Sequence, residues 1–84
     1  MHNRHAWNET TADGAKRYIE ARKFGGHWSL RSKLGRSGEW RRHEPPLVGD
    51  LETLRGILAN KYQRRRASHD DIRSVERLLA QARK

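Results

Sequence analysis

Aromatic and basic side chains alternate along two runs of the sequence, Lys16–Phe24 and His27–Leu34. Side chains two residues apart on a β-strand point to the same face, so two strands here would gather these groups on one surface. Such a surface is typical of sheets that bind nucleic acid, because aromatic rings stack on bases while Arg and Lys side chains hold phosphates. The candidate binding residues on the two runs are Tyr18, Arg22, Phe24, Arg31 and Lys33.

Two further groups of arginines are candidates for holding phosphates. One is the pair Arg41 and Arg42, and the other is the triplet Arg64, Arg65 and Arg66. Cations at the carboxyl end of a helix complement its dipole and contribute ~0.3–1 kcal/mol each. Three adjacent arginines exceed what this structural role requires, so we include the triplet among the candidate binding residues.

The distribution of charge indicates an anionic partner. The chain of 84 residues has a formal net charge of +9, and the segment Lys16–His43 contains nine basic and only two acidic residues. A basic surface concentrated in one segment is the electrostatic footprint of a phosphate-backbone binder, although Lys and Arg also keep small domains soluble. We expect a nucleic acid, RNA in particular, or alternatively an acidic protein as the partner.

The sequence contains no constellation that predicts catalysis, a metal or a cofactor. It has no cysteine, which excludes a disulfide scaffold and a thiolate zinc site. Its five histidines never stand four residues apart on a predicted helix, and no glycine-rich phosphate loop occurs. No apolar run is long enough for a membrane-spanning helix or a signal-peptide core. We therefore expect a non-enzymatic, cytoplasmic protein without a membrane partner.

One segment resembles a family of toxins. The residues Arg22-Lys23-Phe24-Gly25-Gly26-His27-Trp28, followed by a basic strand-like stretch and a Leu-rich helix, are similar to the middle of HicA-type mRNA interferases. The resemblance covers about a third of the chain and implies that His27 is an acid-base group. It also implies an amphipathic helix before the turn, which this sequence does not show, and a second C-terminal helix departs from the family.

The elements that position the candidate residues begin with a predicted β-hairpin. Gly25-Gly26 supplies the positive φ angles of a two-residue turn and joins strands at about 16–24 and 27–34. In that register Glu20 faces Arg31, a favourable pair, and the apolar face carries Ile19, Ala21, Trp28 and Leu30. The alternative is a helix over Gly14–Phe24 with Asp13 as its N-cap.

The rest of the chain is predicted to contain a short third strand, two helices and a flexible arm. The strand spans about 39–43 and ends before Pro45-Pro46, which cannot donate to a ladder. Apolar residues at helical spacing predict helices at about 50–66, with Asp50 as N-cap, and 69–82, capped by Ser68. Residues 1–14 show neither period and are interpreted as the arm. We thus expect one α+β domain at 15–84, a three-stranded meander with a helical hairpin packed on one face.

Overall fold

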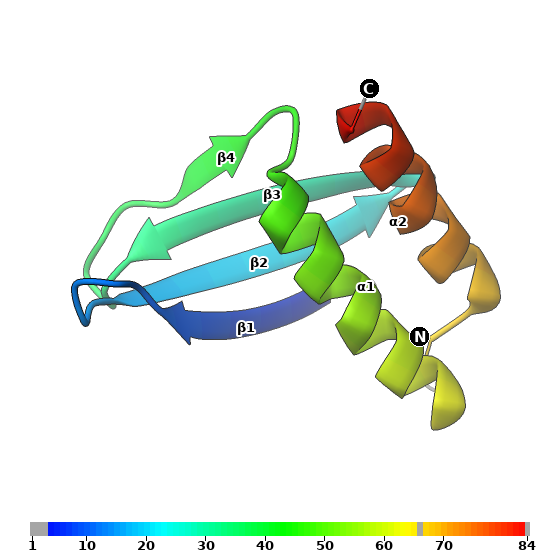
Figure 1. Ribbon diagram of the computed structural model, residues 1–84, viewed down its shortest axis with the longest axis horizontal. Helices are drawn as coiled ribbons and strands as arrows, with labels where there is room; N and C mark the ends of the chain where they lie inside the picture. Colours follow the sequence, from blue (N-terminus) through cyan, green and yellow to red (C-terminus); the bar gives the residue numbers. More distant parts are fainter. Residues whose placement is uncertain (1–3, 66, 84) are drawn as a thin grey trace. The chain divides into compact units, whose positions relative to one another are not determined.

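The computed structural model describes residues 4–65 and 67–83, and it has an α+β fold, as predicted from the sequence. The chain divides into two compact units, a sheet at Arg4–Glu44 and a helical unit that begins at Pro45. Figure 1 shows the four strands followed by the two helices. The elements are β1 (Arg4–Thr10), β2 (Lys16–Phe24), β3 (His27–Leu34), β4 (Arg41–His43), α1 (Val48–Gln63) and α2 (His69–Ala82). No described helix has the length and hydropathy needed to cross a membrane.

The predicted hairpin is confirmed, and the alternative helix over Gly14–Phe24 is wrong. Strands β2 and β3 have the predicted bounds and pair antiparallel, with Phe24 opposite His27. Gly25 and Gly26 have φ angles of 52° and 82°, values that favour glycine because it has no Cβ atom. A helix is not formed because a two-residue turn joins two segments in which apolar and polar side chains alternate, and both features specify a β-hairpin.

The prediction of a flexible arm at residues 1–14 is wrong for β1. Arg4–Thr10 pairs antiparallel with β2 along its whole length, which gives the sheet the order β1-β2-β3-β4. His5 and Trp7 stand opposite Ala21 and Ile19, so they alternate onto the same face as those apolar residues. The connection to β2 closes with a hydrogen bond of 2.8 Å from the Thr11 amide to the Ala15 carbonyl.

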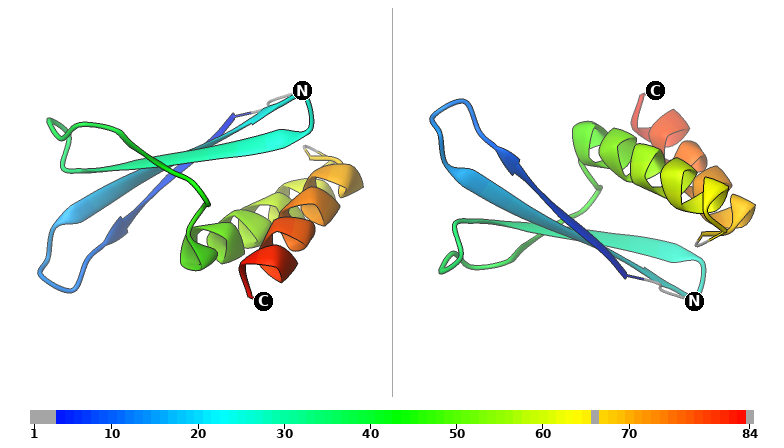
Figure 2. Two further views of the ribbon diagram at one scale, coloured as in Figure 1. Left: turned by 90° about the horizontal axis from the view of Figure 1, so that it is seen from above. Right: turned by 90° about the horizontal axis from the view of Figure 1, so that it is seen from below.

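The sheet has one buried face and one exposed face. The apolar face has Ile19, Ala21, Trp28 and Leu30 at its centre, none of them more than 8% exposed. We call the opposite face, which carries Tyr18, Arg22, Phe24, Arg31, Lys33 and Arg42, the basic face. The side chains of the basic face are exposed or half-buried, apart from that of Glu20. The strand order places β1 at one edge of the sheet and β4 at the other. The two views in Figure 2 show that the strands twist relative to one another.

Strand β4 is shorter than the predicted strand at 39–43. Pairing with β3 starts only at Arg41, opposite Ser32. The turn before it is tight at Gly38, where a Cβ atom would lie 2.1 Å from the Leu34 carbonyl oxygen. Glu39 and Trp40 follow this turn and belong to no strand, so β4 begins only after them.

The helical unit is an antiparallel hairpin (Figure 1). Its core contains Leu51, Leu54 and Leu58 of α1 together with Val75 and Leu79 of α2, all at most 3% exposed. Ion pairs join the outer surfaces of the two helices, 3.4 Å from Arg55 to Glu76 and 3.0 Å from Arg83 to Glu52. These pairs run in opposite directions along the two helices, as an antiparallel arrangement requires.

The helix boundaries were predicted well for α2 and less well for α1. Ser68 caps α2, because its hydroxyl accepts a 3.2 Å hydrogen bond from the Asp71 amide, as predicted. Helix α1 begins two residues earlier than predicted, at Val48, so Asp50 lies buried in the first turn and is not the N-cap. The helix ends at Gln63 because Arg64 and Arg65 leave helical geometry, with Arg65 at φ 58°. The packing of the helices on one face of the sheet stays a prediction.

Candidate nucleic-acid interface

The pairing of β2 with β3 brings the five predicted residues of the hairpin onto the basic face. Tyr18 stands opposite Lys33, and Arg22 and Phe24 follow on the same side of β2. Arg31 stands opposite Arg42 of β4, which adds a sixth predicted residue to this face. Further basic groups on the same side are Arg4 of β1 and Lys16 of β2. The basic face therefore contains six cations and one acid, Glu20.

Trp40 is the centre of a cluster that the sequence analysis did not include among the binding residues. The Arg31 guanidinium lies 4.4 Å from the centroid of the Trp40 ring, and the Lys33 ammonium lies 4.9 Å from it. Lys33 also lies 5.8 Å from the centroid of the Tyr18 ring. We call Tyr18, Arg31, Lys33 and Trp40 the tryptophan cluster. The sequence feature that could have identified Trp40 is its two-residue spacing from Arg42, because side chains two residues apart in an extended segment point to the same side.

Arg31 is held in position by a buried carboxylate. Glu20 is 2% exposed, and its Oε1 atom accepts a 3.0 Å hydrogen bond from Arg31 Nε and lies 2.8 Å from a terminal guanidinium nitrogen. Its other oxygen forms a 2.8 Å ion pair with Arg4. A carboxylate between two arginines removes part of their repulsion and fixes the direction of their planar groups. Glu20 thus aligns Arg31 beneath the Trp40 ring.

The far end of the basic face carries a second exposed ring. Phe24 is 61% exposed, and the Arg22 guanidinium lies 5.2 Å from its centroid. His27 stands opposite Phe24 across the turn and is exposed. A large exposed aromatic ring beside a cation has the composition of a stacking site for an unpaired base.

Of the remaining predicted residues, Arg41 belongs to the sheet, and Arg64 and Arg65 belong to the helical unit. Arg41 stands opposite Ser32 and so lies on the other side of the sheet from Arg42. Arg64 and Arg65 belong to the helical unit, where both are exposed, and Arg66 lies outside the described residues. Six of the ten predicted residues therefore lie on the basic face of the sheet.

The surroundings of His27 differ from what the toxin resemblance implies. Strands β1 and β2 precede the Gly25-Gly26 turn, where the resemblance implies an amphipathic helix. Within the part of the chain that the structure describes, no three His, Asp or Glu side chains gather as a metal site. The acid-base role of His27 stays a prediction of the resemblance.

No family of proteins matches the chain, and neither a curated protein nor a solved structure matches it.

Proposed function

We propose that this chain binds single-stranded nucleic acid, RNA or DNA, through the basic face of its sheet. The observation that supports the proposal most strongly is the tryptophan cluster, in which Trp40 lies against Arg31 and Lys33. Rings that stack on bases and cations that contact phosphates alternate in single-strand binding proteins. The cluster combines both groups in one place.

The two ends of the basic face give a bound strand two places to stack. Tyr18 and Phe24 are six residues apart on β2, so at about 3.3 Å per residue their backbones are separated by roughly 20 Å. Arg22 lies between them, and Arg42 flanks the tryptophan cluster on β4. A strand along β2 would place one base near Trp40, another on Phe24, and intervening phosphates near the arginines.

A single strand fits this surface better than a duplex. Stacking on a protein ring requires an unstacked base, and base pairs in a duplex are already stacked. The basic face consists of β-strands, whereas the element that most often enters a major groove is an α-helix. We therefore expect duplexes to bind only through nonspecific attraction to phosphates.

The proposal is tested by removing the central ring. Trp40→Ala should weaken binding to a labelled decanucleotide of RNA or DNA, measured by fluorescence anisotropy, because stacking contributes ~1–3 kcal/mol per base. This corresponds to roughly 5- to 150-fold in affinity. Phe24→Ala should have a smaller effect in the same direction because its ring has one cationic neighbour.

The matched control is Tyr62→Ala, which removes an exposed ring from the helical unit. Its affinity should equal that of the unaltered protein. If Trp40→Ala and Tyr62→Ala bind alike, the tryptophan cluster is not a stacking site, and a protein with no measurable affinity at low salt would exclude the function.

A further inference from the structure

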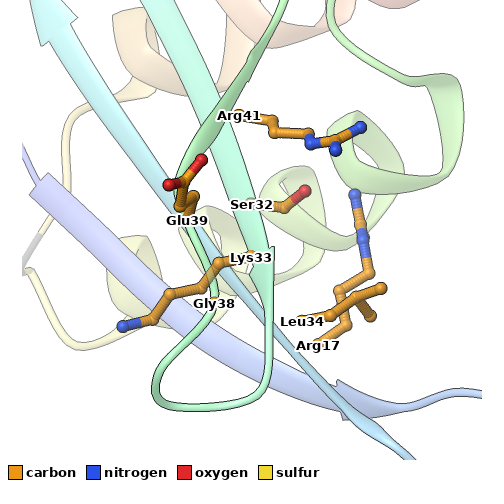
Figure 3. A pocket seen from close by; sticks show the side chains of 7 residues that line it. All are labelled: Arg17, Ser32, Lys33, Leu34, Gly38, Glu39 and Arg41. Atoms are coloured by element: carbon orange, nitrogen blue, oxygen red, sulfur yellow. The ribbon is translucent and has the colours of Figure 1, made fainter.

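A hollow of about 600 Å³ lies beside β3 and β4, next to the turn that joins them. Its lining includes the basic residues Arg17, Lys33 and Arg41, the hydroxyl residue Ser32 and the acid Glu39. Figure 3 shows Arg17 and Arg41 on one side of β3 with their guanidinium groups extended toward one another, while Lys33 and Glu39 extend on the other side. The Glu39 carboxylate is thus directed away from the guanidinium groups of Arg17 and Arg41.

Strand pairing places these groups together. Arg41 stands directly opposite Ser32, and Arg17 stands opposite Leu34, two residues further along β3. Arg17 forms a 2.9 Å ion pair with Glu9, which helps to hold its guanidinium at the hollow. Its side chain is 14% exposed, so its charge acts in surroundings with little water. Arg41 is exposed and approaches from the edge strand.

Ser32 is prepared to act as a donor. Its Oγ atom lies 2.6 Å from His43 Nε2, and Ser32 is 7% exposed. When Nε2 carries the hydrogen, His43 donates to Ser32, and the serine hydroxyl can then donate its own hydrogen to a third group. A hydrogen-bond acceptor bound in the hollow would favour the arrangement in which His43 donates to Ser32 and Ser32 donates to the acceptor.

We propose that this hollow binds a phosphate group, either free inorganic phosphate or the terminal phosphate of a larger molecule. Planar guanidinium groups bind phosphate oxygens in pairs, so two of them from opposite sides fit one tetrahedral anion. The Ser32 hydroxyl supplies a further hydrogen bond. The anion also offsets the repulsion between Arg17 and Arg41. Arg17, Ser32 and Arg41 lie on the opposite side of the sheet from the basic face. The phosphate site they form therefore does not depend on the proposed binding of single strands.

The test is a titration of the full chain with inorganic phosphate, followed by amide chemical shifts at constant ionic strength. The unaltered protein should show saturable shifts at Ser32, Arg41 and His43. Arg41→Gln should raise the dissociation constant about tenfold, because a charge-assisted pair of hydrogen bonds is lost. Ser32→Ala should raise it by a smaller factor.

The control is Arg77→Gln, which removes the same charge from an exposed position on α2 in the helical unit. It should leave phosphate binding unchanged. Equal effects of Arg41→Gln and Arg77→Gln, or shifts that never saturate, would overturn the proposal. Decanucleotides with a 5′-phosphate and with a 5′-hydroxyl distinguish the sources: stronger shifts at the same amides with the phosphorylated strand assign the site to a nucleic-acid end, and equal behaviour of the two strands assigns it to free phosphate.

Discussion

At the scale of single residues, the basic face depends on one buried acid. Glu20 forms ion pairs with Arg4 and Arg31, and its carboxylate is almost completely shielded from water. A buried charge of this kind is stable only because both partners bind it. The sequence predicted the pairing of Glu20 with Arg31, because both positions follow from the hairpin register. Arg4 was missed because β1 was interpreted as an arm.

Replacing Glu20 tests this arrangement. We expect Glu20→Gln to lower the free energy of unfolding by about 1–3 kcal/mol, because an amide leaves two arginines without their charged partner. Urea denaturation followed by tryptophan fluorescence measures the change. Glu44→Gln is the control, since its ion pair with Arg42 is exposed on both sides, and we expect a change within about 0.5 kcal/mol. Similar effects of the two substitutions would show that Glu20 has no special role.

A second residue-scale prediction concerns the turn between β1 and β2. The Thr11 hydroxyl donates to the Asp13 carboxylate and, with the Ala15 amide, holds the pKa of Asp13 below its usual value of 3.8. A lowered folded-state pKa means that this stabilisation is present above pH 3.8 and is lost as the pH falls through the pKa of the folded state. A carboxyl NMR titration should give a midpoint below 3.8, and Thr11→Val should raise it. A midpoint that Thr11→Val does not move would contradict this assignment.

At the scale of elements, the hairpin was predictable and the first strand was not. Gly25-Gly26 fixes both turn type and register, and aliphatic alternation confirms them. In β1 the residues that alternate onto the apolar face are His5 and Trp7, so a search for aliphatic periodicity finds nothing. Trp40 was missed as a binding residue for a related reason. It lies in unpaired backbone before β4, and only the structure shows which cations it contacts.

Removal of β1 distinguishes a strand from an arm. Deletion of residues 1–10 should expose the β2 edge, remove the buried His5 side chain and destabilise the sheet by several kcal/mol, because all seven pairings between β1 and β2 are lost. Thermal denaturation and amide exchange of β2 measure the effect. A truncated protein with unchanged stability and unchanged protection in β2 would show that the segment is an arm after all.

At the scale of the whole molecule, the net charge of +9 and the six cations of the basic face predict strong salt dependence. Each phosphate neutralised on a single strand contributes about −0.7 to the slope of log K against log salt. With about four contacts from the basic face, the slope should be near −3. Arg77→Gln on α2 changes the net charge by the same amount as Lys33→Gln, but only Lys33→Gln should reduce the slope. An equal reduction would mean that total charge, rather than the basic face, determines binding.

An acidic protein is the alternative partner for such a surface, and capture from lysate separates it from nucleic acid. Treatment with nuclease should remove the bound material if the partner is RNA or DNA. Retention of a protein after this treatment would favour the alternative, in which charge mainly accelerates encounter.

The most direct measurement is an amide-shift titration of the full chain with a decanucleotide, because it reports affinity and location together. We predict shifts concentrated on Tyr18, Arg22, Phe24, Lys33 and the Trp40 indole, smaller at higher salt, with little change in α1 and α2. Shifts confined to the helical unit, or none at low salt, would contradict binding through the basic face.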